Sequence, residues 1–524
     1  MAVTIRVVVL LTIAIQVWAE ELDPVRDQIA WFLKKTQGVK TTLTTANGEP
    51  VERRKTRTLN QKLLYNNFFT ESIAHANRER IPERIVHGKG VGAFGYFEVT
   101  HNVTEYIKAD FLSEIGKKTP VAARFSPAIG ERGLSDTSRS MKGFAVKFYT
   151  NEGNFDIVGL STPMFAFKDP TLFFTFLHVE SRNPTTNIVD ENMHWDFLTR
   201  NPESLNMFTT VYTDGGIPRG YRKMPGHSIH TYQVQNKNGD IYFVRFHFIP
   251  EDGEDSLTAE EANELDGNDP DSFTRDMYEA IACGKRVAWD FGIQLLTPEQ
   301  ALNANIDVFD PTLELPYEDY PLTPVGKLVL NRNPVNYFAE IEQLAYCPCN
   351  LVPGIDGAPD KLFESRLWAY KDAQFYRLGI NFHNIKVNCP LASVTRHYYY
   401  KDGAAPVNDN GEDTPNYYDN SFNGPMPYDD YDRSKIIEIE EGESDNLWQI
   451  AEMYSKLSKG ERSRLISNIV NSLGNTVKFI RERAVKIYTE IEPDLGNRIK
   501  NGLKEFEKEP ACRIPFDEMP KNRD

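Results

Sequence analysis

A single histidine ahead of a run of glycines is the first feature of this chain with the chemistry of a reactive site. The segment RIPERIVHGKGVGAFGYFEVT, residues 80–100, places His87 directly before four glycines that lie within the next eight residues. Because glycine has no Cβ, such a run lets a flat or bulky group approach the backbone closely. Arg84 lies three residues before the histidine, and Ser126 carries a hydroxyl that can fix the tautomer of the imidazole. A lone histidine is most often a core or loop residue bonded to a backbone carbonyl, but this context favours a functional role for His87.

A second feature is an arginine and a tyrosine four residues apart. The segment SRLWAYKDAQFYRLG, residues 365–379, places Arg366 and Tyr370 on one face if it is helical, with Arg377 on a neighbouring turn. A cation beside a phenol stabilises the phenolate, and a phenolate is a hard oxygen donor that suits ferric iron. The alternative is an ordinary amphipathic helix whose Tyr and Arg side chains reach solvent at its rim.

The elements that position these residues are predicted to be short strands between about residues 90 and 390. Runs rich in β-branched and aromatic residues recur there, for example at 121–126, 144–150 and 240–248. Within 144–150, Phe144, Val146 and Phe148 alternate with the residues between them, which is the period of a strand with one buried face. We therefore expect an antiparallel barrel or sandwich.

The segment after residue 444 has helical periodicity instead, with a break expected at Gly460. Its apolar stripe consists of Leu447, Ile450, Tyr454, Leu457, Leu465, Ile469, Leu473, Val477 and Ile480. We expect a small helical unit whose stripe packs against the barrel; a binding groove is the alternative. The chain is thus predicted to be α+β, with strands and helices segregated.

Composition limits the class of partner and of site. The 524 residues, 40% of them apolar, are enough for a large core and for more than one domain. The formal net charge of −16 would repel phosphates, so we expect no nucleic-acid partner. Five cysteines, an odd number spread along the chain, do not indicate a disulfide framework. Cys347 and Cys349 are too closely spaced for a zinc clamp without another Cys/His pair nearby.

The N-terminus predicts a secretory signal peptide at residues 1–19. Arg6 precedes an apolar run at 7–17, and Val17-Trp18-Ala19 has the small-residue spacing of a cleavage site. A membrane anchor is the alternative, but the run is shorter than the roughly 20 residues that a bilayer requires. No later segment is apolar enough to cross, so we expect no membrane partner. Asn102-Val103-Thr104 is a glycosylation sequon compatible with export.

Five segments together resemble the haem catalases. They are RIPERIVHGKGVGAFGYFEVT, RLWAYKDAQFYRLG, GDIYFVRFHF, PVGKLVLNRNPVNYFAEIEQ and IKVNCP. The resemblance extends from about residue 43 to about residue 506, and it implies the α+β haem catalase fold with an antiparallel eight-stranded β-barrel. The implied organisation is a signal peptide at 1–19, an N-terminal arm at 20–88, a haem-binding barrel core at 89–390, a wrapping segment at 391–445 and a C-terminal helical domain at 446–524.

The resemblance also implies haem b as cofactor and a role for each site residue. Tyr370 would be the proximal iron ligand, a role that tyrosine has in catalases generally, and Arg366 would hold its oxygen ionised. His87 would be the distal acid/base, oriented by Ser126. The propionate-binding residues would be Arg84, Arg124 and Arg377. The pocket-lining residues would be Val86, Phe165, Phe173, Tyr346 and Leu362.

The chain departs from the family pattern near the distal histidine. Leu160 stands where the family has an asparagine whose amide holds peroxide over the iron. The hydroxyl of Ser161 is expected to point elsewhere, because adjacent residues of a strand alternate faces. AlaGln at 373–374 replaces the usual ThrHis. Four positions that hold NADPH in many animal catalases are also changed, and we expect no NADPH: Asn206, Thr210, Gly215 and Ile249.

These observations predict a catalase that converts hydrogen peroxide to water and oxygen, at a reduced rate because of Leu160. Two alternatives stay open: a haem-binding catalase-like protein with little turnover and a structural role, and a peroxidase that oxidises small organic donors. The resemblance implies a homotetramer assembled through the N-terminal arms. Secretion follows from the signal peptide, whereas family analogy alone would favour the peroxisome.

Overall fold

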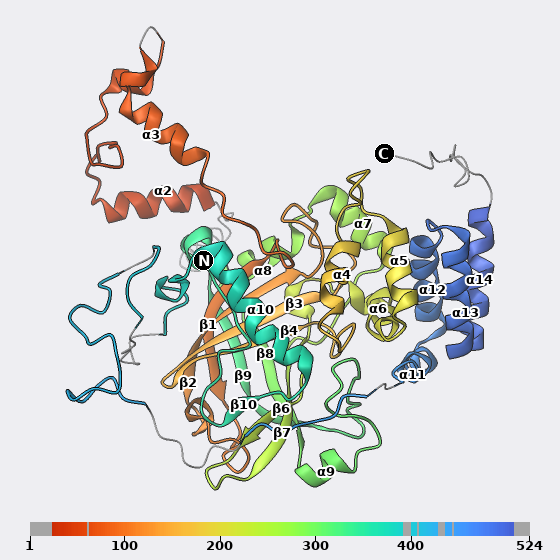
Figure 1. Ribbon diagram of the computed structural model, residues 1–524. Helices are drawn as coiled ribbons and strands as arrows, with labels where there is room; N and C mark the ends of the chain where they lie inside the picture. The colour runs from red at the N-terminus through yellow and green to blue at the C-terminus, as the bar shows by residue number, and fades with distance from the viewer. Residues whose placement is uncertain are drawn as a thin grey trace, which may run out of the picture. The chain divides into compact units, whose positions relative to one another are not determined.

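The chain forms two compact units, residues 1–82 and residues 83–524 (Figure 1). The computed structural model describes residues 24–59, 62–390, 400–405, 408–427, 435–442 and 445–507. The predicted signal peptide at 1–19 lies outside these residues. None of the described helices is both long enough and apolar enough to cross a membrane. The predicted domain boundaries within 83–524 stay predictions.

The larger unit is built on a closed antiparallel β-barrel, as predicted (Figure 1). Its strands are β1 (Val91–Val99), β2 (Lys118–Pro127), β3 (Lys142–Thr150), β4 (Gly153–Leu160), β5 (Gly226–His227), β6 (Tyr232–Gln235), β7 (Ile241–Pro250), β8 (Val287–Leu296), β9 (Leu322–Arg332) and β10 (Ile355–Gly357). Neighbours run β5-β4-β3-β2-β1-β9-β8, and β7 closes the ring by pairing with both β5 and β8. β6 also pairs with β7, and β10 pairs with β6.

Aromatic rings fill the barrel interior. Phe97 makes edge contacts with Phe148 and Phe291, with ring centroids 5.5 and 5.3 Å apart. Phe125 packs on Phe144 at 4.6 Å, and both rings contact a fully buried tryptophan of β8. Offset and edge-to-face ring pairs of this kind contribute beyond the apolar area that they bury. The aromatic residues that recur along the sequence therefore form the barrel core.

The outer face of β3 is buried as well, so the expectation of a single buried face was wrong. Lys147 and Tyr149 point away from the barrel interior but are only 1% and 7% exposed. The Nζ atom of Lys147 lies 2.8 Å from both carboxylate oxygens of Asp156. The hydroxyl of Tyr149 donates to the backbone carbonyl of Val387. A later part of the chain covers this face, which alternation within one strand cannot reveal.

Most helices of the larger unit before residue 390 lie between strands in the sequence, and the last of them follows β10. They are α4 (Leu172–Val179), α5 (Glu191–Arg200), α6 (Ser204–Tyr212), α7 (Ala259–Asn268), α8 (Ser272–Ala282), α9 (Pro298–Leu302) and α10 (Lys361–Leu378). The C-terminal helices are α11 (Trp448–Lys456), α12 (Lys459–Leu473), α13 (Lys478–Ile491) and α14 (Pro493–Leu503). Short 3-10 or π turns lie at 53–56, 63–65, 110–112, 214–216, 221–223, 338–342, 382–384 and 504–507.

The apolar stripe of the C-terminal unit is a packing face, but its partner is the helix pair α5–α6 and not the barrel (Figure 1). Trp195 of α5 stacks on Tyr212 of α6 at 5.6 Å and contacts Tyr488 of α13 edge-on. Trp195 also donates through its indole nitrogen to Ser472 of α12. These inserted helices lie between β4 and β5 in the sequence, where they were not predicted.

The break in the stripe lies two residues before the expected Gly460. Ser458 caps α12, because its hydroxyl accepts from the amide of Glu461 and the Glu461 carboxylate accepts from the amide of Ser458. This capping box sets the start of a helix more strongly than an exposed glycine interrupts one. Gly460 consequently lies within the first turn of α12.

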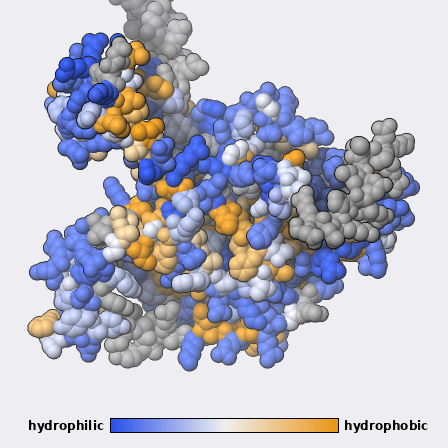
Figure 2. All heavy atoms as spheres, turned by 45° about the horizontal axis from the view of Figure 1, so that its top comes forward, coloured by the Kyte–Doolittle hydropathy of each residue, from blue (hydrophilic) through white to orange (hydrophobic). Residues whose placement is uncertain are grey.

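The smaller unit exposes an unusual amount of apolar surface. Its helices α2 (Pro24–Lys35) and α3 (Asn67–Ala76) contain no buried residue. Trp31 of α2 is 54% exposed, and Figure 2 shows hydrophobic side chains on the molecular surface. The other exposed apolar residues of α2 are Val25, Ile29, Phe32 and Leu33. Such a helix has not buried its apolar residues within its own unit.

We expect Gly95→Ala to lower the free energy of unfolding by about 1–3 kcal/mol, because overpacking forces backbone shifts. A Cβ at this position of β1 would lie 1.9 Å from the carbonyl oxygen of Val329. The matched control is Gly133→Ala, whose Cβ would meet nothing within 4 Å. Thermal melts followed by circular dichroism compare the two variants. Equal midpoints for both would contradict the tight approach of β1 to β9.

Candidate functional site

His87 lies in the loop before β1 and is held from both its backbone and its ring. Its backbone adopts a left-handed conformation with φ of 62°, which is uncommon for a residue with a side chain. The His87 amide donates to the carbonyl of Ala128 at 2.9 Å. Its Nδ1 atom shares a hydrogen bond of 2.9 Å with the hydroxyl of Ser126 on β2, which is the pairing predicted from the sequence.

Three cross-strand partners form a row beneath this imidazole. Ser126 of β2 pairs with Gly143 of β3, and Gly143 pairs with Leu160 of β4. Directly paired residues of a sheet face the same side. A Cβ at Gly143 would lie 2.6 Å from Nδ1 of His87 and 2.7 Å from Oγ of Ser126. The ring therefore packs on the backbone of Gly143, and the side chain of Leu160 lies on the same face.

Ser161 follows Leu160 and does not supply the missing polar group. Its hydroxyl accepts a hydrogen bond of 3.0 Å from the amide of Lys142, and its own amide donates to the Lys142 carbonyl. The predicted orientation of Ser161 away from the site agrees with these bonds. Leu160 is 5% exposed, so it adds a buried apolar side chain to the face that carries the Ser126 hydroxyl.

The imidazole of His87 is neutral at physiological pH. Its pKa falls from the usual 6.5 to about 3, chiefly because burial disfavours the charged ring. The positive charges of Arg124, Arg366 and Arg84 lower it in addition. A neutral imidazole can accept a proton and then return it.

α10 carries Arg366 and Tyr370 in the predicted helical spacing. The Nη2 atom of Arg366 donates to the Tyr370 hydroxyl at 3.1 Å and to the carbonyl of Val158 at 2.8 Å. Burial opposes the charge on Arg366, but Tyr370 and other acidic groups raise its pKa, so the guanidinium stays charged. The cation and the phenol are therefore in direct contact, as the spacing predicts.

Two residues that sequence reasoning missed complete this network. Nη1 of Arg366 donates to Nε2 of His230 at 2.8 Å, so the other ring nitrogen of His230 carries the proton and donates to Asp360 at 3.0 Å. The Asp360 carboxylate also caps α10 by accepting from the amide of Phe363. Asp360 could have been predicted as a helix cap, because Asp is a preferred residue at that position. The sequence around His230, between β5 and β6, contains no pattern that predicts its role.

Two arginines converge around one carboxylate, and the charge of Arg124 acts on both of them. Nη2 of Arg84 donates to three backbone carbonyls of residues 341–344, and Nη1 of Arg377 donates to the carbonyl of Glu342 at 2.6 Å. The Glu342 carboxylate lies 3.5 Å from Arg84 and 3.8 Å from Arg377. The guanidinium of Arg124 lies against Gly90, where a Cβ would be 2.6 Å away. Gly90 therefore makes room for the side chain of Arg124 and not for an external group.

This cluster has more positive charge than it can pair. Burial and the charge of Arg124 and Arg377 hold the pKa of Arg84 well below its usual range. Burial also lowers the pKa of Arg377 to about 10. Nη1 of Arg84 and Nε of Arg124 are buried without a hydrogen-bond partner. Buried donors in native proteins nearly always have partners. These two atoms can therefore donate to a ligand that brings an acceptor.

Comparisons with known proteins identify the family. The family described as Catalase matches residues 44–424, and the family described as Catalase-related immune-responsive matches residues 440–503. The chain belongs to the catalase family. It is 43% identical to the catalase of Rattus norvegicus over 500 residues, covering 93% of this chain and 95% of that protein. It is 45% identical to the catalase of Glandirana rugosa over 478 residues, covering 89% and 90%.

Solved structures agree with this assignment. Catalase A from Saccharomyces cerevisiae has a TM-score of 0.84 with 37% identity, and the match covers 88% of this chain and 99% of that one. A fungal catalase gives the same TM-score with 36% identity, covering 90% and 97%. The predicted family and fold are thus confirmed. As a catalase, the chain decomposes hydrogen peroxide, and the family implies haem.

The unpaired arginine atoms fit the haem that the catalase family implies. Haem carries two propionate carboxylates, and guanidiniums bind carboxylates through charge-assisted hydrogen bonds. Of the three predicted propionate partners, Arg84 and Arg377 lie beside Glu342, and the charge of Arg124 acts on both. The orphaned donors belong to Arg84 and Arg124. The tyrosine and the charged Arg366 on α10 provide an oxygen ligand of the required chemistry.

The residues predicted to line the catalase pocket fall into more than one group. Phe165, Phe173 and Leu362 pack in the apolar cluster that contains Leu160. Tyr346 belongs to a different cluster with Phe94, and its hydroxyl donates to the carbonyl of Ala122. Val86 is half-buried in the loop next to His87. The structure thus brings three of the five together with Leu160.

Of the positions expected to have lost NADPH binding, three lie on or just after α6 and the fourth lies in the barrel wall. Thr210 and Gly215 line a cavity of about 250 Å³ that also reaches His227 and Tyr317. Asn206 is buried and donates to the carbonyl of Thr312 and to Gln449. Ile249 pairs with Asp290 in the barrel wall. The absence of NADPH stays a prediction.

The two cysteines at 347 and 349 form a pair that the sequence analysis, which excluded only a disulfide framework, did not predict. They are joined by a disulfide, because one intervening proline brings their Cα atoms to 4.9 Å. Cys283 and Cys389 are free. Among the residues that the structure describes, no group of three or more His, Cys, Asp or Glu side chains is arranged to hold a metal ion.

Peroxide decomposition by the haem-loaded protein should not titrate near pH 6.5. Because the pKa of His87 is about 3, the ring stays neutral at every pH above that value and gains its proton only as the pH falls toward 3. We therefore expect no loss of initial oxygen release per haem attributable to this ring between pH 8 and 5. A loss centred near pH 6.5 that disappears in His87→Gln would contradict the pKa shift.

Proposed function

We propose that this chain is a haem b catalase in which His87 handles the proton of peroxide and Tyr370 ligates the iron. Two molecules of hydrogen peroxide give two of water and one of oxygen. The observation that carries the proposal is a geometric link through β4: Arg366, which binds Tyr370, donates to the carbonyl of Val158, and Leu160 of the same strand lies in the row beneath His87. β4 therefore lies next to both the strand that supports His87 and the helix that carries Tyr370.

The protein residues have separate tasks in this proposal. Haem, when bound, supplies the iron that exchanges electrons with peroxide. His87 takes a proton from one peroxide oxygen and delivers it to the other, which makes that oxygen a better leaving group. Ser126 keeps the ring oriented. The relay from Asp360 through His230 to Arg366 holds the guanidinium against the Tyr370 oxygen.

Leu160 is the reason to propose a reduced rate. Its side chain shares a face with Gly143, against which the imidazole packs, and it can donate no hydrogen bond. Removing one preorganised donor costs on the order of 10²–10³ in rate. The same residue favours the second candidate function, a secreted haem-binding protein with little turnover. Oxygen release per haem no faster than that of free haemin would select the second candidate.

We also propose secretion and assembly as a homotetramer. The order of charged, apolar and small residues at 1–19 supports export, and the disulfide between Cys347 and Cys349 suits an oxidising compartment. Peroxisomal location by family analogy is the alternative. The exposed apolar residues of α2 support assembly through the N-terminal arm, because they have no burial within their own unit.

We expect Tyr370→Phe to lose most of the bound haem or to shift its absorption spectrum, because phenylalanine has no oxygen to ligate iron. The matched control is Tyr376→Phe on the same helix, since that side chain is 79% exposed. Haem content per chain and the visible spectrum provide the readouts. An unchanged spectrum in Tyr370→Phe would rule out this ligand.

We expect Leu160→Asn to raise the initial rate of oxygen release by ~10-fold or more with haem content unchanged, because the amide supplies a donor beside the imidazole. Leu160→Ala is the matched control, since it widens the same space without adding a donor. His87→Ala should reduce the natural rate by roughly 10²–10⁴. If Leu160→Ala raises the rate as much as Leu160→Asn, space rather than hydrogen bonding limits this site.

A further inference from the structure

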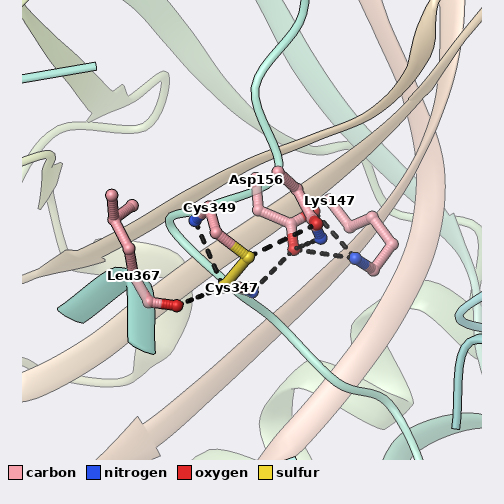
Figure 3. The surroundings of a disulfide bond; sticks show 6 residues. Lys147, Asp156, Cys347, Cys349 and Leu367 are labelled. Atoms are coloured by element: carbon pink, nitrogen blue, oxygen red, sulfur yellow. Dashed lines mark hydrogen bonds and ion pairs between the residues drawn. A yellow bond between two sulfur atoms is a disulfide. The ribbon is translucent and has the colours of Figure 1, made fainter. Parts of the chain in front are cut away.

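The disulfide between Cys347 and Cys349 occupies a turn directly after Tyr346, on the covered outer face of β3 and β4 (Figure 3). Asp156 of β4 and its partner Lys147 of β3 lie on one side of it in the figure, and Leu367 of α10 lies on the other. Neither peroxide decomposition nor haem binding uses this pair.

The turn holds its shape without the disulfide. The amide of Asn350 donates to the carbonyl of Cys347 at 2.9 Å, and the amide of Asp156 donates to the carbonyl of Asn350 at 3.1 Å. The Asp156 carboxylate accepts from the amide of Cys347 at 2.9 Å and from the side chain of Asn350 at 2.8 Å. A cross-link between residues two apart also closes a very short loop, where the entropic stabilisation is smallest. Hydrogen bonds therefore hold this turn in addition to the disulfide.

The two sulfur atoms are not equivalent. Cys347 is 4% exposed, whereas Cys349 is half-buried. The amide of Cys349 donates toward Sγ of Cys347 at 3.2 Å. A hydrogen bond to sulfur stabilises a thiolate, and a stabilised thiolate is the better leaving group in exchange. An incoming thiolate therefore reaches Sγ of Cys349 more easily and expels Cys347.

We propose that Cys347 and Cys349 form a thiol–disulfide exchange site that oxidises a thiol substrate. The substrate thiolate attacks Sγ of Cys349, the bond between the two cysteine sulfurs breaks, and its electron pair leaves on Sγ of Cys347. A second substrate thiolate then attacks the substrate sulfur of the mixed disulfide and releases Cys349 as a thiolate. Two protons from the substrate thiols end on the two cysteines, so two thiols become one disulfide.

Reduction also changes the contact with the helix that carries Tyr370. Sγ of Cys347 lies 3.6 Å from the carbonyl oxygen of Leu367, which is the residue after Arg366. As a thiol, Cys347 can donate a weak hydrogen bond to this oxygen, whereas a disulfide sulfur has no proton to donate. The exchange site therefore has a direct physical connection to α10.

The test uses the folded full-length protein and dithiothreitol as the thiol. After reduction, excess dithiothreitol is removed, the thiols are alkylated, and peptides are analysed by mass spectrometry. We expect two alkyl groups on the peptide that contains residues 347–349, with an unchanged far-ultraviolet circular dichroism spectrum. Oxidised glutathione added before alkylation should remove both groups. Peptide-level detection excludes Cys283, Cys389 and Cys512, and no step depends on haem or on peroxide turnover.

The direction of attack is tested with single-cysteine variants and 5,5′-dithiobis(2-nitrobenzoate). Cys349 in Cys347→Ser should form the mixed disulfide at least about tenfold faster than Cys347 in Cys349→Ser, because access controls the rate. Equal rates or the reverse order would overturn the assigned direction. The proposal as a whole fails if dithiothreitol opens the bond only when the protein unfolds, or if oxidised glutathione does not restore it.

Discussion

The charge on Arg366 is the constraint on which the rest of the site depends. A buried cation is costly unless its donors are satisfied. Here the barrel strand β4 supplies the carbonyl of Val158, the β5–β6 loop supplies His230, and α10 supplies the Tyr370 oxygen. Because each acceptor comes from a different element, the bonds that satisfy the guanidinium also fix these elements relative to one another.

The arginines near Glu342 differ from Arg366, because some of their buried hydrogen-bond donors have no acceptor. Two donors of this cluster, on Arg84 and Arg124, and the Oε2 atom of Glu342 itself are buried without partners. A ligand that brings carboxylates to this cluster relieves a cost already present in the fold, and a ligand that binds only the folded state stabilises it by mass action. Cofactor binding and stability are therefore linked at this position.

Local patterns predicted the residues whose partners are close in sequence or lie in a regular register. The i, i+4 pair on α10 and the barrel strands are of this kind, and the hydroxyl of Ser126 was correctly assigned to His87. Contacts set by tertiary folding were missed, including His230 and the burial of Lys147 by a segment about 200 residues away. The helices α5 and α6 were missed because barrel periodicity was extended across them.

Gly143 shows how a residue can control chemistry that it does not perform. The imidazole rests on its backbone because no Cβ is present, so any substitution displaces the ring before it changes a charge or a hydrogen bond. In a mutational scan, this position would look catalytic. Its contribution is purely geometric. The backbone of β3 sets the position of the His87 ring, and only glycine leaves that position unchanged.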